Sequence, residues 1–241
     1  MPRNTSSLRF RLTSSIMKLF FLPVFQRFGT LLDGLSVTVL VAVLAIVASL
    51  IVGLALAFAR RSSLRPVRWL AVAYIDVFRN TPFVVQLFFF YFGLPEIGIL
   101  IDAVTTGIVA LSLAAATSTA EVIRAGMESV DRGVVEAARA YGLSRWQQYR
   151  YVILPIAFRF AVRPLGSVFV NLVLTTSVLS TITVNDLMSN AENLASETFR
   201  PFETYLVVLV LYWLATFAVS LIVNLASALW LRRSSLRVAV R

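Results

Sequence analysis

This chain of 241 residues contains no cysteine and no histidine. Without cysteine it can form no disulfide framework, zinc–thiolate site, iron–sulfur cluster or cysteine nucleophile. Without histidine it lacks the commonest general base and metal ligand, so we expect no catalytic residues and no metal site. No segment matches the Gly-x-x-x-x-Gly-Lys-Ser/Thr phosphate-binding loop either, so we expect the chain itself to bind no ATP. Most enzyme classes are excluded on these grounds.

Charged residues are also scarce. They make up 14% of the chain, whereas hydrophobic residues make up 59%, and soluble domains have about a quarter charged residues. The formal net charge is +10, and Lys18 is the only lysine. A basic balance can indicate nucleic-acid binding, but only where a soluble module carries a basic face. Here most cations lie between apolar runs, so we expect membrane lipid and no nucleic acid as a partner.

Long apolar runs are the main feature of the sequence. Each is long enough for a transmembrane helix of about 20 residues, with some tilt for the longer ones. We therefore predict an all-α membrane protein with five transmembrane helices and an acidic loop at residues 183–203. The predicted spans are Leu35–Ala59, Trp69–Phe92, Thr105–Ile123, Leu154–Ile182 and Tyr205–Leu231.

The charges between these runs predict the topology. The cations gather on one side: Arg60, Arg61, Arg65 and Arg68 after the first run; Arg124, Arg132, Arg139, Arg145, Arg150, Arg159 and Arg163 after the third; and Arg232, Arg233, Arg237 and Arg241 at the C-terminal end. Cytoplasmic loops carry the excess of Lys and Arg, so that side is predicted to be cytoplasmic. Five crossings then place the N-terminus outside and the C-terminus in the cytoplasm. Only the basic N-terminal segment disagrees with this assignment.

Residues 1–28 are predicted to be an N-terminal extension of the transmembrane domain, which covers residues 29–233; residues 234–241 form a cytoplasmic tail. Two interpretations of the extension are open. It is a basic amphipathic segment that lies on the membrane surface, or it is a poorly ordered terminus.

Residues 124–153 form a polar stretch with helical character of its own. Glu136–Ala140 is a strong helix-forming run, and Gly142 stands where the end of a helix favours a left-handed residue. Ser144 can cap a second short helix, Arg145–Val152, before Pro155. We predict a compact, protruding unit whose surface, smooth at Ala137 and Ala138, another protein can approach closely.

The motif of Glu136-Ala137-Ala138, Gly142 and Ile153-Leu154-Pro155 resembles the EAA loop of binding-protein-dependent ATP-binding cassette (ABC) importers. In that family the loop carries the coupling helix, which docks on the ATP-hydrolysing subunit. The resemblance implies that the residues in contact with this ATPase are Glu136, Ala137, Ala138, Gly142, Leu143 and Pro155.

Further motifs resemble the permeases of polar amino acids within that family: Tyr74–Pro82 followed by Gln86, Tyr91–Pro95, Ala120–Gly126 and Thr198–Tyr205. The resemblance implies a type I importer permease fold in the bacterial cytoplasmic (inner) membrane. The partners it implies are a dimer of ABC ATPase subunits, a second permease subunit (the same chain or another) and an extracytoplasmic solute-binding protein. ATP would be bound by the partner ATPase, and the cargo would be a polar amino acid.

The sequence departs from the family pattern in three places. Gly133-Val134-Val135 stands where Gly-Gln-Trp is usual, and Ile156 where Gln is usual. Leu174–Val178 replaces the usual Lys-Asp-Thr-Ser-Leu, which leaves the middle of the fourth span without charge. The substrate preference of the family therefore cannot be transferred directly.

Polar residues within the spans are candidates for a translocation path: Gln86, Glu121, Asn171, Thr175, Thr176 and Ser177. An ionisable residue inside a span is costly, and it is functional by default. Glu121 has a structural alternative, however, because Arg124 lies three residues on and on the same helix face. The hydroxyls of the fourth span have one as well, since they can serve as hydrogen bonds between helices.

Two other functions remain open alternatives. An ion-gradient-driven secondary transporter would need internal repeats or ionisable groups at mid-membrane, and a lipid-modifying membrane enzyme would need paired carboxylates or histidine. Dependence of uptake on a partner ATPase distinguishes the importer from both.

Overall fold

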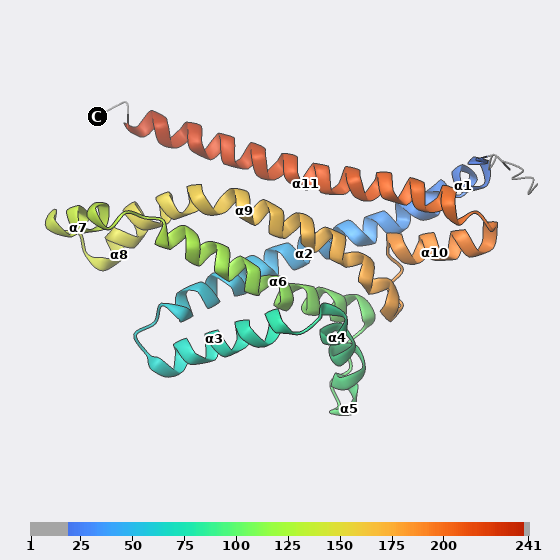
Figure 1. Ribbon diagram of the computed structural model, residues 1–241, viewed down its shortest axis with the longest axis horizontal. Helices are drawn as coiled ribbons and strands as arrows, with labels where there is room; N and C mark the ends of the chain where they lie inside the picture. The colour runs from blue at the N-terminus through green and yellow to red at the C-terminus, as the bar shows by residue number, and fades with distance from the viewer. Residues whose placement is uncertain (1–18, 239–241) are drawn as a thin grey trace, which may run out of the picture.

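The computed structural model describes the backbone of residues 19–238 and the side chains of residues 19–228. These residues form helices and connecting turns and contain no strand, so the predicted all-α architecture is confirmed. Figure 1 shows α2, α6, α9 and α11 running along one common long axis. The helices in chain order are α1 (Leu22–Gln26), α2 (Phe28–Arg60), α3 (Arg65–Asn80), α4 (Phe83–Phe88), η1 (Phe89–Gly93), α5 (Leu94–Glu96), α6 (Ala103–Glu128), α7 (Arg132–Ala140), α8 (Arg145–Gln147), η2 (Gln148–Ile153), α9 (Leu154–Thr175), η3 (Thr176–Ile182), α10 (Leu187–Thr198) and α11 (Pro201–Val238).

Four helices among the described residues are long and apolar enough to cross a membrane: Phe28–Arg60, Ala103–Glu128, Arg145–Ile182 and Pro201–Ala228. They contain the first, third and fourth predicted spans and residues 205–228 of the fifth, and each begins earlier than predicted. With 33 residues, α2 is about 50 Å long at 1.5 Å per residue, well beyond the 30 Å hydrocarbon core of a bilayer. Hydropathy located these spans because lipid-facing side chains must be apolar all along them.

The second predicted span, Trp69–Phe92, is wrong as one continuous helix. The chain leaves α3 at Thr81, whose backbone is extended (φ −112°, ψ 132°), and resumes as α4 after Pro82. A residue before proline is disfavoured in the α region, so the break follows from the local sequence. The Gln86 side chain donates hydrogen bonds of 2.8 Å to the carbonyls of Phe78 and Thr81, which stabilises the break. In Figure 1, α4 and α5 turn away from the direction of α3.

The acidic loop predicted at residues 183–203 is wrong too, because most of it is the helix α10. The Asp186 side chain caps this helix by accepting a hydrogen bond from the Ser189 amide (2.9 Å). Leu187, Ala191 and Leu194 form a buried face at i, i+4 and i+7, the spacing of an amphipathic helix. This face packs against α2 and α11.

The N-terminal segment in the described range also packs on the bundle. Val24 in α1 is fully buried in the same apolar cluster as Leu187 and Leu194. The Phe20 amide donates a 3.1 Å hydrogen bond to Glu203, and Arg27 pairs with Glu197. The basic residues Arg3, Arg9, Arg11 and Lys18 lie outside the described residues. Residues 19–27 therefore belong structurally to the end of the bundle that carries α10.

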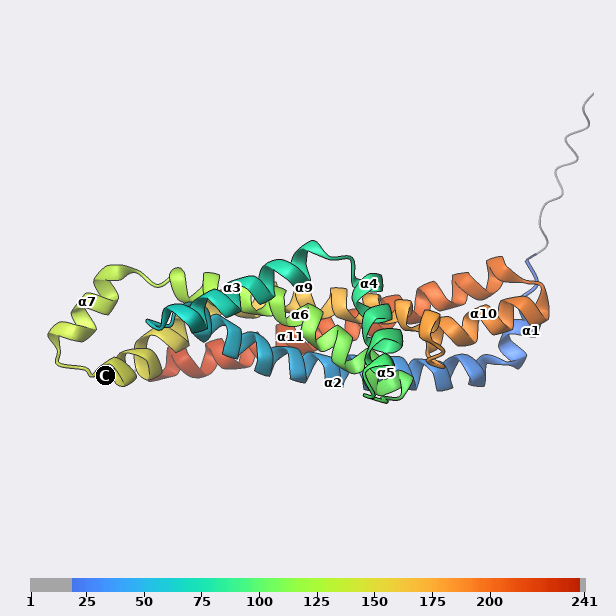
Figure 2. The ribbon, with the colours of Figure 1, turned by 90° about the horizontal axis from the view of Figure 1, so that it is seen from below.

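The two ends of the bundle differ in what they carry. Figures 1 and 2 both show α7 at one end, near the C-terminal end of α11, and α1 with α10 at the opposite end. The described chain therefore begins at one end of the bundle and finishes at the other.

Close approach of helices depends on glycine at several points. A Cβ on Gly126 in α6 would lie 2.7 Å from the carbonyl oxygen of Ala157 in α9, and one on Gly53 in α2 would lie 2.6 Å from the Thr119 side chain in α6. Small residues allow this packing in membranes, where no hydrophobic effect drives helices together.

We expect Gly126→Ala to destabilise the bundle by about 1–3 kcal/mol, the usual cost of overpacking, because the clash is with backbone. Gly29→Ala is the matched control, since a Cβ at Gly29 in α2 meets nothing within 4 Å. It should stabilise the chain slightly through helix propensity. Thermal unfolding of the two variants in lipid nanodiscs checks this, and equal midpoints would contradict it.

Candidate functional site

The polar segment between α6 and α9 forms a protruding unit built on α7. Asp131 starts this helix by accepting a 2.6 Å hydrogen bond from the Gly133 amide. Val135 packs in one apolar cluster with Tyr149 and Ile153 of η2, and Ala138 is buried. Glu136 and Ala137 lie on the opposite, exposed side. α7 therefore has an inner face that fixes it to the fourth span and a free outer face.

The turn after α7 has the geometry that the sequence predicts. Gly142 has φ +78°, in the left-handed region that glycine adopts without a steric cost. Its amide donates to the Arg139 carbonyl (2.9 Å), and the Leu143 amide donates to the Ala138 carbonyl (3.2 Å), which together make a Schellman motif. Ser144 and Gln147 then form a capping box. The orientation of α7 is thus fixed by backbone hydrogen bonds.

The predicted second short helix, Arg145–Val152, is not a separate element. Residues Arg145–Ile182 are helical without interruption, so α8, η2 and α9 are one rod that starts at the protruding unit. Its π-helical part, η2, ends at Ile153, two residues before Pro155. A proline removes one amide donor from the helix, and a π-bulge is one way in which a helix accommodates such a change. The protruding unit is therefore structurally continuous with the fourth span.

Two large aromatic side chains at this end were missed by the sequence analysis. Tyr141 is 87% exposed and Trp146 is 73% exposed, on either side of the Gly142 turn. Tyr and Trp are enriched among the residues that dominate binding energy in protein interfaces. The signal in the sequence was the pair of aromatic residues flanking a helix-ending glycine.

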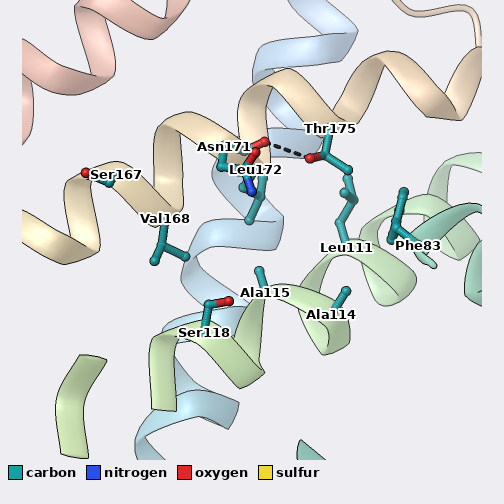
Figure 3. A pocket seen from close by; sticks show the side chains of 10 residues that line it. All are labelled: Phe83, Leu111, Ala114, Ala115, Ser118, Ser167, Val168, Asn171, Leu172 and Thr175. Atoms are coloured by element: carbon teal, nitrogen blue, oxygen red, sulfur yellow. Dashed lines mark hydrogen bonds between the residues drawn. The ribbon is translucent and has the colours of Figure 1, made fainter. Parts of the chain in front are cut away.

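A pocket of about 340 Å³ lies between α4, α6 and α9. Figure 3 shows Ser118 and Ala115 of α6 pointing toward α9, with Val168 and Leu172 of α9 opposite them. Thr175 donates a 2.7 Å hydrogen bond to the Asn171 carbonyl. The lining residues are Phe83, Leu111, Ala114, Ala115, Ser118, Ser167, Val168, Asn171, Leu172 and Thr175.

A second pocket of about 470 Å³ adjoins the first, between α9 and α11. Ser167 and Asn171 line both pockets, and Arg163, Ser220 and Asn224 add further polar groups to the second. A polar strip thus follows α9 for about three turns. The side chains of Ser118, Ser167 and Asn171 are exposed on the single chain, although they belong to helices of membrane-spanning length.

Only some of the candidate path residues line a pocket. Asn171 and Thr175 line the first pocket. Thr176 is fully buried, donates to the Val173 carbonyl (2.7 Å) and does not line the pocket. Ser177 is half-buried and donates to the Leu174 carbonyl (2.8 Å). Gln86 is buried at the break between α3 and α4.

Glu121 lies at the centre of an arginine cluster, where α2, α3 and α6 meet. Its Oε2 accepts from Arg124 at 2.7 Å, and its Oε1 pairs with Arg60 and lies 3.9 Å from Arg79. The predicted i, i+3 pair with Arg124 is present, whereas the partner on α2, Arg60, could not be predicted from residue spacing. Arg79 faces Glu121, and no ion pair among residues 19–228 joins it to Asp76. This geometry matches the structural alternative for Glu121.

The chain is similar to known proteins in both sequence and structure. Residues 45–233 match the family described as "Binding-protein-dependent transport system inner membrane component". The chain is 38% identical over 201 residues to the probable glutamine ABC transporter permease protein GlnM of Bacillus subtilis, covering 83% of this chain and 93% of that protein. It is 34% identical over 196 residues to the glutamine transport system permease protein GlnP of Escherichia coli K12, covering 80% and 90%. Over 213 residues it is 34% identical to the nopaline transport system permease protein NocM of Agrobacterium fabrum, covering 84% and 88%.

Among solved structures, the chain is similar to a crystal structure of an amino acid ABC transporter with histidines. The TM-score is 0.82 at 34% sequence identity, over 88% of this chain and 99% of that one. An inward-facing structure of the MetNI methionine ABC transporter has the same fold, with a TM-score of 0.67 at 20% identity, over 83% and 97% of the chains.

Proposed function

Because this chain belongs to the family of binding-protein-dependent transport system inner membrane components, as an ABC importer permease of the inner membrane, we propose that it moves a polar amino acid inward along the polar strip of α9. The exposed face of α7 would receive the movement that drives this transport. Its relatives are named as permeases for glutamine and nopaline, and none of these names supports the ion-driven alternative. The observation that carries the proposal is the fixed α7 unit, which continues as one rod into the span that lines both pockets.

The partner at α7 is an ABC ATPase, and the permease itself has no catalytic role. Glu136, Ala137 and Gly142 are exposed there and are free to contact such a subunit. Tyr141 and Trp146 supply the large aromatic surface that would anchor the contact. ATP would be bound by two such subunits, since the sequence has no phosphate-binding loop of its own.

A second permease subunit would cover the polar side of the bundle. The outward face of α11 is apolar, with Leu209, Trp213 and Phe217 exposed, as expected against lipid. Ser118, Ser167 and Asn171 are exposed as well, and polar side chains facing lipid are costly. Pairing two permeases on this side would enclose the two pockets as a path between the subunits. The sequence leaves open whether that subunit is another copy.

The first pocket imposes no strict charge selection on the amino acid that the permease carries. Serine, threonine and asparagine line the first pocket, and they can hydrogen-bond a polar solute without fixing its charge. The choice of amino acid would then rest mainly with the solute-binding protein. In this arrangement the α1–α10 end faces that protein outside the cell, and α7 with the C-terminus lies in the cytoplasm, as the arginine distribution predicts.

The proposed cycle is a rigid-body switch between two states. ATP binding closes the two ATPase subunits, and their motion displaces α7. The rod α8–η2–α9 tilts with it, which opens the path to one side of the membrane and closes it to the other.

Uptake of labelled glutamine into proteoliposomes that contain the permease, a partner ABC ATPase and a solute-binding protein tests this function. We expect uptake that needs internal ATP and persists when ion gradients are collapsed by ionophores. Uptake that needs a gradient and not ATP would refute it. Other amino acids that bind the solute-binding protein serve as further substrates in the same assay.

Isosteric variants of two neighbouring threonines test the path. Thr175→Val removes a hydroxyl that lines the first pocket, and Thr176→Val removes a buried hydroxyl of the same helix outside the pocket. We expect Thr175→Val to lower uptake by about 5- to 30-fold, the effect of 1–2 kcal/mol, because a cargo group would lose its hydrogen bond. Thr176→Val should transport normally. Equal effects of the two substitutions would count against this path.

A further inference from the structure

The junction of α2, α10 and α11 contains a buried carboxylate that the transport path does not use. Asp186 is 1% exposed. Its Oδ1 accepts from the Ser189 amide, and its Oδ2 is buried without a hydrogen-bond partner. A buried, unsatisfied ionised oxygen carries a large desolvation cost. A proton on this oxygen would remove the charge and turn the oxygen into a hydrogen-bond donor.

The side chains around Asp186 are suited to receive a proton. Tyr212 of α11 packs against the apolar cluster that contains Leu187, the residue next to Asp186. Its hydroxyl is also buried without a hydrogen-bond partner, and the negative charge of Asp186 acts on it. A protonated Asp186 can donate from Oδ2 to the Tyr212 oxygen, and Tyr212 can in turn donate to a threonine oxygen. One bound proton would thus give both groups a partner and would also remove the buried negative charge, which a hydrogen bond from Tyr212 to the ionised carboxylate would leave in place.

The same junction fixes the position of α10. The Leu187 amide donates to the Thr38 hydroxyl (3.1 Å), and Asn190 donates to the Thr30 carbonyl (2.8 Å). A Cβ on Gly34 would lie 2.7 Å from the Asp186 carbonyl oxygen, so the backbones of α2 and α10 are in direct contact. Ionisation of Asp186 would therefore place a negative charge inside the contact that holds α10 on α2.

We propose that Asp186 and Tyr212 form a proton-binding site, and that the bound proton keeps α10 docked between α2 and α11. This goes beyond the proposed transport function and does not depend on it. α10 links α9 to α11, the two helices that line the second pocket. Loss of the proton consequently loosens the connection between them.

The charges around the site agree with proton binding. Burial raises the pKa of Asp186 to about 6, and the negative charge of Glu192 on α10 adds to the shift, against the lowering effect of the Ser189 hydrogen bond. On α2, Gly34 and Thr38 carry no charge and Asp33 is exposed; Thr176 of η3 is neutral. Since the docked pKa lies above the ordinary value of 3.8, docking is strongest at low pH and is lost as pH rises through about 6.

Hydrogen–deuterium exchange of the full chain in lipid nanodiscs measures this docking. After correction for the intrinsic pH dependence of exchange, we expect the protection of the α10 amides to fall about tenfold between pH 5 and pH 8, as a pKa difference of this size dictates. Asp186→Asn keeps the helix cap and mimics the neutral acid, so it should abolish the change. Constant protection in the wild type, or the same change in Asp186→Asn, would overturn the proposal.

Asp102 provides the matched control, because it caps α6 in the same way but is exposed. Hydrogen bonds from Thr105 lower the pKa of Asp102, so Asp102→Asn should leave the α10 profile unchanged. Should Asp186→Asn fail to fold, Tyr212→Phe decides the question. It removes the acceptor for the proton and is expected to move the midpoint to lower pH, and an unmoved midpoint refutes the role of Tyr212 and with it the proposed site.

Discussion

Replacing Gly142 by valine should reduce ATP-driven uptake about tenfold while the chain still inserts into the membrane. The φ of +78° at this position costs a residue with a Cβ about 1–2 kcal/mol, and a β-branched residue more. A shift of 1–2 kcal/mol changes a conformational equilibrium by about 5- to 30-fold, so few molecules would keep the turn that orients α7. Uptake and stimulated ATPase activity, measured in the same proteoliposomes, should fall together.

Gly98 provides the control for backbone strain alone. It has φ +82° in the loop between α5 and α6, and a Cβ there would meet nothing within 4 Å. Gly98→Val therefore introduces the same kind of strain far along the chain from α7, and its coupling should remain normal. Asparagine tolerates the left-handed region, so Gly142→Asn should retain more uptake than Gly142→Val. Equal uptake by Gly142→Val and Gly98→Val would mean that the turn has no part in coupling.

Local chemistry made part of this molecule predictable from sequence. The left-handed turn at Gly142 and the cap at Ser144 depend only on neighbouring residues, and both are present. Of the five spans predicted from the apolar runs, four are found as long helices, because lipid imposes its requirement residue by residue. The break at Thr81–Pro82 was equally local, but the hydropathy of the flanking runs concealed it. Proline is a stronger signal than mean hydropathy at such a point.

The predictions that were wrong or incomplete concern features that depend on contacts between segments far apart in the chain. The acidic residues Asp186, Glu192 and Glu197 predict a loop where α10 is found, because the buried face of this helix is recognisable only from its packing against α2 and α11. Glu121 and Arg124 were recognisable as a pair from their spacing, but Arg60 is 61 residues away in sequence. The polar residues of the strip on α9 can be recognised in the sequence by their type. Which of its hydroxyls reach the pocket depends on the rotation of the helix, so Thr175 and Thr176 could not be told apart.

Removal of the charge at Glu121 should have the largest effect on stability. Glu121→Gln leaves Arg60, Arg79 and Arg124 facing one another where α2, α3 and α6 meet. The side chain of Glu121 is 22% exposed and those of Arg60 and Arg124 are 25% and 30% exposed, so water screens them only in part. Breaking a fully buried pair costs about 3–5 kcal/mol. For this partly buried cluster we expect a loss of about 2–3 kcal/mol, measured by thermal unfolding in nanodiscs.

Glu128→Gln controls for the loss of one carboxylate beside the same arginine. Glu128 pairs with Arg124 at 2.6 Å, but its side chain is 54% exposed, and exposed ion pairs contribute about 0–1 kcal/mol. Kinetics then separate the two roles of Glu121. If it only ties the three helices together, the Glu121→Gln protein that remains folded transports with an unchanged KM for the amino acid. A raised KM with unaltered thermal stability would instead place Glu121 in the path and overturn the structural assignment.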